Sequence, residues 1–381
     1  MLDLSTDAGG IPANHPPIVV IGGFFLSRGA AMEWAKPIYS KGQIDRAAKM
    51  LVNPGANDGG GDTSALVIVN NWRAAHNFPL NTFQVTLRKK SQDIDGSRLV
   101  AQRIKRMSSI EAKLARFPRM RMSQMQDIGG CRAILSSVKN VERLVEKYTT
   151  SDIKHKLDSL DDYINNPKES GYRGVHMIYR YNSDREGPSV YNGLFVEMQI
   201  RTRLQHTWAT AVETVGTFLQ QALKSSMGEA QWLRFFSLMG SAFAIKERCP
   251  AMVPGTPLEE KSLNAEIRDI EARLNVRSVL TMYQQAIRVA KDGLKKGDHY
   301  YLLTLEPSKH QMRVTGFKKT QLVEASEKYV SEEARIANTP GSEAVLVSVD
   351  SIASLERAYP NYFLDTTTFL AELERLVTSG A

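Results

Sequence analysis

The sequence predicts an α+β fold in which a mixed sheet is flanked by helices, and three observations support this class. Segments with the three-to-four-residue apolar spacing of helices are interspersed with short segments that alternate like strands. The chain has 381 residues, enough for two or three domains with separate cores. Three prolines, Pro250, Pro254 and Pro257, mark a boundary, and a second series of strands and helices follows it.

We expect four parts along the chain, two before the proline boundary and two after it. Residues 1–37, rich in glycine and proline, form an N-terminal extension, and residues 38–250 form the larger domain. Residues 251–298 form a helical connector because the helical pattern runs unbroken over 259–291. Residues 299–381 form a small C-terminal α+β domain, with a hairpin over 299–306 and 310–317, helices over 321–337 and 366–377, and a strand over 344–349.

The larger domain is predicted to contain helices over 44–52, 63–76, 102–117 and 137–148, and strands over 130–136, 174–181 and 194–202. The helix over 102–117 follows from the spacing of Ile104, Met107, Ile110, Leu114 and Phe117. The glycine-rich segment 55–62 lacks the Gly-Lys-Ser/Thr ending of a phosphate-binding loop, so we interpret it as a connector.

Positive charge is concentrated in the first two thirds of the chain. Residues 1–250 carry 33 basic and 23 acidic side chains, and the remainder of the totals of 49 and 41 leaves 16 and 18 beyond residue 250. This distribution favours polyanionic ligands such as nucleotides or RNA. Two cysteines, Cys131 and Cys249, exclude a disulfide framework and a four-cysteine zinc site. We expect a cytoplasmic protein without a membrane segment, because no apolar run approaches 18 residues.

Two acidic residues are candidates for chemistry. Alternation along 195–202 places Glu197 and Gln199 on the face opposite Val196, Met198 and Ile200, although an ordinary half-buried strand would have the same pattern. Asp127 precedes a Gly-Gly pair, where a backbone can approach a ligand closely. Asp127 and Glu197 could share a magnesium ion, which prefers oxygen ligands, but two acids distant in sequence are weak evidence.

Two further segments carry groups that suit nucleotide binding. Residues 101–132 contain a dense cationic cluster, which is either a solvated surface or a phosphate-binding site. Its members are Arg103, Lys105, Arg106, Lys113, Arg116, Arg119, Arg121 and Arg132. In segment 166–176, Tyr172 stands near two glycines, where it could stack a base or simply belong to a turn.

Together these features resemble the RelA/SpoT nucleotidyltransferase domain over roughly residues 40–250. Four signatures carry the resemblance: Arg103-x-Lys105-x4-Ile110-x2-Lys113, Asp127-Ile-Gly-Gly-x-Arg132, Lys168-x2-Gly171-Tyr172-Arg173-x2-His176 and Glu197-x-Gln199-Ile200-Arg201-Thr202. The resemblance implies a pyrophosphokinase that moves the β,γ-pyrophosphate of ATP to a 3′-hydroxyl. No His-Asp dipeptide occurs, so the hydrolase domain of long family members is expected to be absent.

The resemblance also implies a role for each matching residue. Asp127 and Glu197 would hold Mg²⁺ and catalyse transfer, with Glu197 helping to deprotonate the hydroxyl. The ATP-binding residues would be Arg103 and Arg132, which sandwich adenine, and Lys105 and Lys113, which bind phosphates. The acceptor-binding residues would be Lys168, Tyr172, Arg173, His176 and Gln199.

The acceptor itself is left open by one departure from the family pattern. Small alarmone synthetases carry Trp-Ala-Ser/Thr-x-Glu-His after Gln-Ile-Arg-Thr, whereas this chain has its acid one place later, at Glu213, and no histidine follows. A tRNA acceptor would give the cationic surplus a purpose, through contacts of Arg116, Arg119 and Arg121 with phosphates.

The segment containing Tyr359 and Tyr362 resembles the Tyr-x-x-Tyr element of fused toxin–antitoxin synthetases of the CapRel type. That resemblance implies self-inhibition by tyrosines that block the ATP site and release by a phage protein; alternatively, both tyrosines only anchor a turn. Three hypotheses follow: a self-inhibited pyrophosphokinase acting on the 3′ CCA end of tRNA in phage defence, a (p)ppGpp synthetase acting on GDP or GTP, and a catalytically inactive nucleotide-binding regulator.

Overall fold

The computed structural model describes most of the chain. It covers residues 19–21, 24–26, 33–52, 63–222, 229–286, 288–292, 295, 297–306, 309, 311–337, 339, 342–348 and 366–378. Tyr359 and Tyr362 lie outside these residues, so the predicted self-inhibition stays a prediction. Within the described part, no helix is both long and apolar enough to cross a membrane.

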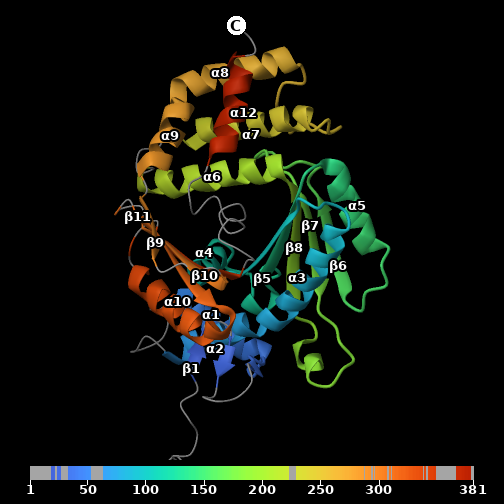
Figure 1. Ribbon diagram of the computed structural model, residues 1–381, viewed down its shortest axis with the longest axis vertical. Helices are drawn as coiled ribbons and strands as arrows, with labels where there is room; N and C mark the ends of the chain where they lie inside the picture. The colour runs from blue at the N-terminus through green and yellow to red at the C-terminus, as the bar shows by residue number, and fades with distance from the viewer. Residues whose placement is uncertain are drawn as a thin grey trace, which may run out of the picture.

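A nine-stranded mixed sheet forms the centre of the molecule, with strand order β6-β7-β8-β5-β4-β12-β10-β11-β9 (Figure 1). Its first five strands are β4 (Leu99–Ile104), β5 (Gly129–Leu135), β6 (Lys156–Asp162), β7 (Val175–Arg180) and β8 (Phe195–Thr202). Strands β5 and β8 are parallel, and their other pairings are antiparallel. The prediction of a mixed sheet flanked by helices is therefore confirmed.

Helices α3 (Asn77–Gln92) and α5 (Val138–Thr149) pack against one face of this sheet. The apolar residues of β8 predicted to share a face, Val196, Met198 and Ile200, are fully buried in the main core. Because side chains alternate along a strand, Glu197 and Gln199 project from the opposite face. The candidate site lies on that second face.

The predicted helix over 102–117 is wrong in its first turn. Residues Leu99–Ile104 form β4, which pairs antiparallel with β5, and only Met107–Arg116 form helix α4. Ile104 lies three residues before Met107, so its position matches the helical apolar spacing although it belongs to the strand. Phe117, the last residue of that spacing, is 47% exposed. Strand pairing with β5 decides the local structure, and it places Arg103 on the sheet.

The connector is also divided differently from the prediction. A helical pattern over 259–291 becomes α8 (Glu260–Leu274), α9 (Val276–Ala286) and the short strand β9 (Arg288–Asp292). Asn275 separates the two helices with a φ of 51°, in the left-handed region that asparagine tolerates better than most residues.

The C-terminal hairpin is confirmed as β10 (Asp298–Glu306) and β11 (Gln311–Lys318), which pair antiparallel. Helix α10 (Leu322–Ile336) packs on β12 (Glu343–Ser348) and β10. At Ser348 and Gln102, β12 also pairs with β4, so the C-terminal strands extend the sheet of the larger domain. The expected small domain is thus continuous with the sheet that carries the candidate site.

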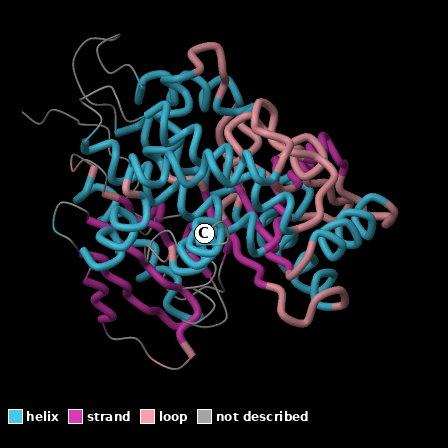
Figure 2. The backbone as a smooth tube through the Cα atoms, turned by 90° about the horizontal axis from the view of Figure 1, so that it is seen from above, coloured by secondary structure: helices cyan, strands magenta, loops and turns pink. Residues whose placement is uncertain are grey.

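A layer of helices lies above the sheet in Figure 1, formed by α6 (Arg203–Ala222), α7 (Glu229–Lys246), α8, α9 and α12 (Thr367–Thr378). Figure 2 shows these helices from above, lying over the strands. Phe369 of α12 is fully buried, with its ring centre 5.9 to 6.3 Å from those of Phe235, Phe236 and Phe243 on α7. The last helix is therefore held against α7 by an aromatic cluster.

The N-terminal part contributes helices α1 (Lys41–Val52) and α2 (Thr63–Ala75) and the short strands β1 (Val19–Ile21), β2 (Phe24–Leu26) and β3 (Glu33–Trp34). Single-turn 3₁₀ helices occur at η2 (Met122–Gln124), η3 (Pro188–Tyr191) and η5 (Lys319–Gln321).

A buried polar network joins α2 to the C-terminal helix α10. Arg73 donates to Tyr329 Oη at 3.1 Å, and Tyr329 donates to Glu333 at 2.6 Å. The same Glu333 carboxylate accepts from the backbone N–H of Met107 at 3.2 Å, at the start of α4. Arg73 Nε donates to the backbone oxygen of Lys105 at 3.1 Å, so the network ends beside a candidate site residue.

The buried His76 predicts a pH-dependent stability. Its ring is 1% exposed, lies against Trp72 and contacts the backbone oxygen of Trp72 through Nδ1 at 2.7 Å. Burial, partly offset by that hydrogen bond, lowers its pKa to about 4. Because an unfolded histidine titrates near 6.5, the unfolded chain binds the proton first as the pH falls, and we expect a loss of about 2 kcal/mol in unfolding free energy between pH 7 and pH 5.

Urea unfolding of the wild type and of His76→Gln at both pH values tests this expectation. The variant lacks the titrating ring, so its stability should depend less on pH by that amount. An unchanged pH dependence in the variant would show that other groups cause the effect.

Candidate active site

A cavity of about 230 Å³ brings seven of the predicted site residues together from four strands and two loops. They are Arg103, Lys105, Asp127, Arg132, His176, Glu197 and Gln199. The remaining lining residues are Ala101, Gln102, Gly130 and Cys131. Lys113 joins this group through its contact with Asp127. Residues separated by almost a hundred positions thus meet at one place, as the sequence motifs predict.

Asp127 lies between two lysines. Lys105 Nζ is 2.9 Å from Oδ2, and Lys113 Nζ is 3.0 Å from Oδ1. Burial raises the pKa of Asp127, but the two ammonium groups more than offset this, and the pKa lies below its ordinary value. Asp127 is therefore ionised at neutral pH, and it holds Lys105 at the wall of the cavity and Lys113 next to Asp127 itself.

Glu197 is fixed by a chain of hydrogen bonds along β8. Gln199 Nε2 donates to Glu197 Oε2 at 2.9 Å, and Arg201 donates to Gln199 Oε1 at 2.7 Å. His176 Nδ1 lies 3.1 Å from Glu197 Oε1. Burial raises the pKa of Glu197, but the contact with His176 and the amide of Gln199 bring it below its ordinary value. The nearby negative charge of Asp127 raises the pKa of Glu197, so the two carboxylates interact electrostatically.

Arg103 and Arg132 stand on neighbouring antiparallel strands. Arg103 is paired with Gly130, and Arg132 with Ala101, so the arginines are diagonal neighbours on the cavity face. Diagonal side chains on such strands are about 7 Å apart, which leaves room for one flat ring between two guanidinium groups. The predicted adenine sandwich is compatible with this register.

Tyr172 lies at the other end of β8, beside Arg201. Its hydroxyl is 2.5 Å from His176 Nε2, and the Arg201 guanidinium lies 5.0 Å from the centre of its ring. Lys168 Nζ lies 5.6 Å from the same ring and 4.2 Å from that of Tyr163. Tyr172 is half-buried. Arg201 belongs to the signature along β8 and shares a face with Glu197 and Gln199, but no role was predicted for it from the sequence.

Arg173 has different surroundings from its predicted acceptor-binding partners. Its side chain is buried, and it donates to the backbone oxygens of Ile164 at 2.8 Å and Ala251 at 2.7 Å. It does not line the cavity described above. The contacts indicate that Arg173 fastens the Tyr172 loop to the segment that follows α7.

The three arginines predicted to contact tRNA are exposed. Arg116 ends α4, Arg119 lies in the following turn, and Arg121 precedes η2. None of the three lines the cavity that contains Asp127 and Glu197. Arg121 instead lines a second cavity, together with Arg180 and Phe195, neither of which the motifs indicated.

The Tyr172 loop fits against α7 through two glycines. Gly171 has a φ of 93°, and a Cβ added to Gly240 would lie 2.6 Å from the Gly171 oxygen and 2.8 Å from its Cα. Trp208 of α6 donates to the backbone oxygen of Phe236 at 2.8 Å, and its ring also meets Gly171. The position of Tyr172 therefore depends on a close contact between two backbones.

Gly240→Ala should displace the Tyr172 loop, because the added methyl group overlaps the backbone at Gly171. We expect a destabilisation of about 1–3 kcal/mol, the usual cost of overpacking, and weaker acceptor binding. Gly216→Ala on α6 is the control, since its Cβ would meet nothing within 4 Å, and alanine favours a helix by about 1 kcal/mol over glycine. Urea unfolding measures both, and equal stabilities would contradict the predicted contact.

Comparison with known proteins gives a family match over part of the chain. Residues 102–216 match the model described as the region found in RelA / SpoT proteins. The predicted resemblance is therefore confirmed over that range, which includes all the residues that line the cavity except Ala101.

Two curated relatives share part of the chain. GTP pyrophosphokinase YjbM of Bacillus subtilis (strain 168) is 32% identical over 127 residues, which are 33% of this chain and 59% of that protein. The uncharacterized protein Rv1366 of Mycobacterium tuberculosis (strain ATCC 25618 / H37Rv) is 30% identical over 115 residues, which are 30% of this chain and 38% of that protein. The chain thus spans less than two thirds of either relative.

Among solved structures, the small alarmone synthetase 2 from Bacillus subtilis aligns with 47% of this chain and 93% of its own. The sequence identity is 21%, and the TM-score is 0.39.

Proposed function

We propose that this protein is a pyrophosphokinase that transfers the β,γ-pyrophosphate of ATP to a nucleotide 3′-hydroxyl. The observation that carries the proposal is the cavity in which two ionised carboxylates, Asp127 and Glu197, lie among lysines and arginines. Cations of this density suit a triphosphate, and a fixed carboxylate suits the removal of a proton from a hydroxyl.

In the proposed reaction, the acceptor 3′-oxygen attacks the β-phosphorus of ATP. A new oxygen–phosphorus bond forms, the bond between the β-phosphorus and the oxygen bridging it to the α-phosphorus breaks, and AMP leaves with that oxygen. Glu197, whose carboxylate is held in place by Gln199 and His176, takes the hydroxyl proton. Lys105 and Lys113 would neutralise the phosphate oxygens, and Arg103 and Arg132 would hold the adenine between them.

We also propose that a magnesium ion binds in the same cavity, where Asp127 and Glu197 would supply oxygen ligands. The support is that both residues line the cavity and that the charge of Asp127 acts on Glu197. Within the described residues, no group of three or more acidic, histidine or cysteine side chains is arranged to hold a metal ion by itself, so substrate phosphates and water would complete the coordination. Mg²⁺ is commonly held this way, by one or two carboxylates and phosphates, and it would supply charge neutralisation at the transferred group.

For the acceptor, we propose the 3′ CCA end of tRNA. The support is the half-buried Tyr172, suited to stacking a terminal base, and the exposed arginines Arg116, Arg119 and Arg121, suited to phosphates of an RNA. GDP or GTP is the second candidate, favoured by the relative named as a GTP pyrophosphokinase. With tRNA as acceptor, transfer would block the terminal hydroxyl and stop translation, as the phage-defence hypothesis requires.

A labelling experiment with the full chain separates the candidates. The purified protein is incubated with γ-³²P-labelled ATP, Mg²⁺, and either total tRNA or GDP and GTP. We expect label on tRNA; label on guanine nucleotide instead would select the second acceptor. No label on any acceptor, with or without a Tyr362→Ala substitution to relieve the proposed self-inhibition, would contradict the pyrophosphokinase proposal.

A further inference from the structure

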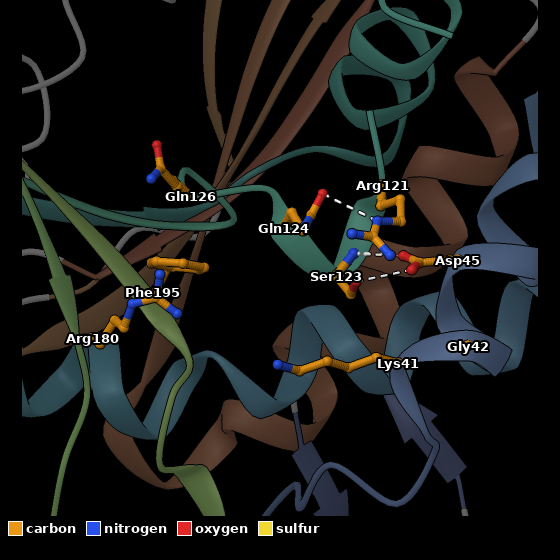
Figure 3. A pocket seen from close by; sticks show the side chains of 9 residues that line it. All are labelled: Lys41, Gly42, Asp45, Arg121, Ser123, Gln124, Gln126, Arg180 and Phe195. Atoms are coloured by element: carbon orange, nitrogen blue, oxygen red, sulfur yellow. Dashed lines mark hydrogen bonds between the residues drawn. The ribbon is translucent and has the colours of Figure 1, made fainter. Parts of the chain in front are cut away.

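A second cavity, of about 530 Å³, is lined by residues that neighbour those of the first cavity in sequence, and Figure 3 shows this lining. Phe195, at the start of β8, lies on the same face of the sheet as Glu197, because the two are separated by one residue. Gln126 of the second cavity directly precedes Asp127 of the first. The residues that line it are Lys41, Gly42, Asp45, Arg121, Ser123, Gln124, Gln126, Arg180 and Phe195.

The lining is cationic. Lys41, Arg121 and Arg180 contribute three positive charges, against one carboxylate, Asp45. Both oxygens of that carboxylate are already used, by the backbone N–H of Ser123 at 2.8 Å and its hydroxyl at 2.9 Å (Figure 3). In the described part of the chain, no carboxylate forms an ion pair with Lys41 or Arg121. These two cations are therefore available to an anionic ligand.

The planar guanidinium group of Arg180 is held in place by an aromatic ring and a carboxylate. Its central carbon lies 4.4 Å from the centre of the Phe195 ring, and its Nε donates to Asp158 at 2.6 Å. Gln126 donates to the other oxygen of Asp158 at 3.2 Å, which fixes that carboxylate in turn. The Arg180 side chain remains 44% exposed. A planar cation with one face covered by a ring offers its other face to a base and its remaining N–H groups to phosphate.

The order of residues along β8 relates this cavity to the acceptor. Arg201 lies beside Tyr172, Gln199 and Glu197 follow, and Phe195 lies beyond Glu197 on the same face. The distance from Glu197 to Phe195 along the strand is about 7 Å. An acceptor chain whose 3′-hydroxyl lies at Glu197 continues from the 5′-phosphate of its terminal nucleotide. The second cavity lies close enough to Glu197 along the strand to receive that continuation.

We propose that the second cavity binds the single-stranded end of a nucleic-acid acceptor, upstream of its terminal nucleotide. This inference rests on the proposed function, since it concerns the path of an acceptor whose 3′-hydroxyl lies at Glu197. Lys41 and Arg121 contact backbone phosphates, and a base stacks on Arg180. The cavity thereby gives preference to RNA over free nucleotides.

Binding measurements on the full chain test this path without requiring turnover. The probe is a fluorescent RNA tetranucleotide, ACCA, whose 3′-deoxy terminus cannot accept pyrophosphate, and 3′-deoxyadenosine 5′-monophosphate serves as the short competitor. The wild type should bind the tetranucleotide more tightly than the mononucleotide. The double variant Lys41→Gln/Arg121→Gln should bind the tetranucleotide about tenfold more weakly, and its salt dependence should fall in slope by about 1.4 for two lost contacts.

A second variant separates charge from stacking. Arg180→Lys keeps the positive charge but loses the flat group, and it should weaken tetranucleotide binding at least about fivefold. The matched control is Lys139→Gln/Arg185→Gln, which removes two exposed charges outside the cavity and should leave binding unchanged.

The outcomes are distinct. Equal affinity of the double variant and the wild type for the tetranucleotide would overturn the inference. A loss of affinity confined to 3′-deoxyadenosine 5′-monophosphate would also overturn it, since the cavity would then hold a small ligand. Loss of tetranucleotide binding in a protein that transfers no pyrophosphate to any acceptor would leave the RNA path standing and contradict the proposed function instead.

Discussion

Replacing Glu197 with glutamine is expected to reduce pyrophosphate transfer about 10³-fold, within the range found for loss of a general base. Glutamine has nearly the same shape, but it cannot accept the hydroxyl proton, and it carries no charge opposite the phosphates. The contacts with His176 and Gln199 show that this carboxylate is already positioned before a substrate arrives. Initial rates of transfer from labelled ATP measure the effect.

Glu142→Gln provides the control for this variant. Glu142 is an exposed acid on α5, outside the cavity, and its replacement should leave the rate unchanged. A thermal unfolding curve shows whether each variant is folded. A Glu197→Gln protein that is folded and keeps more than a tenth of the wild-type rate would exclude Glu197 as the base.

Replacing Phe369 with alanine is expected to destabilise the protein by about 3–5 kcal/mol, the usual cost of removing a buried aromatic ring. Phe369 is fully buried among three phenylalanines of α7, so the substitution leaves a cavity at the contact between α12 and α7. Domains are stable by only about 5–15 kcal/mol, so the loss would be a large fraction of the total. Urea unfolding measures the change in free energy.

Thr368→Ala, one residue earlier on the exposed side of α12, should change stability by less than about 0.5 kcal/mol. If both substitutions had the same small effect, α12 would not be anchored by the aromatic cluster. Because α7 also contacts the loop of Tyr172 through Gly240, Phe369→Ala should in addition lower the affinity for the acceptor.

The arrangement of the catalytic cavity could largely be predicted from local patterns. Alternation along β8 determines which side Glu197 and Gln199 face, because a strand has no other way to orient neighbouring side chains. The Gly-Gly pair after Asp127 likewise indicated a close approach, and Gly130 lies in the cavity wall. Such features depend on a few adjacent residues, which a sequence displays directly.

Features that depend on distant partners could not be predicted. Ile104 extends the helical apolar spacing of α4 backwards, and only the pairing of Leu99–Ile104 with β5 shows that this segment is a strand. Arg173 shares a motif with Tyr172, yet the carbonyl groups that surround it belong to segments that the motif does not contain. The second cavity combines α1, η2, β7 and β8, whose proximity follows from the fold as a whole.

The pairing of β12 with β4 also determines which fragments of this protein can be studied. Removing the C-terminal strands would leave β4 as an exposed edge, with unpaired backbone groups alongside the strand that carries Arg103. Open edges invite pairing with other molecules, and a chain truncated near residue 250 should therefore tend to aggregate. Truncation would also remove α8 and α12 from the aromatic surface of α7, so inactivity of such a fragment would not reveal the chemistry of the intact protein.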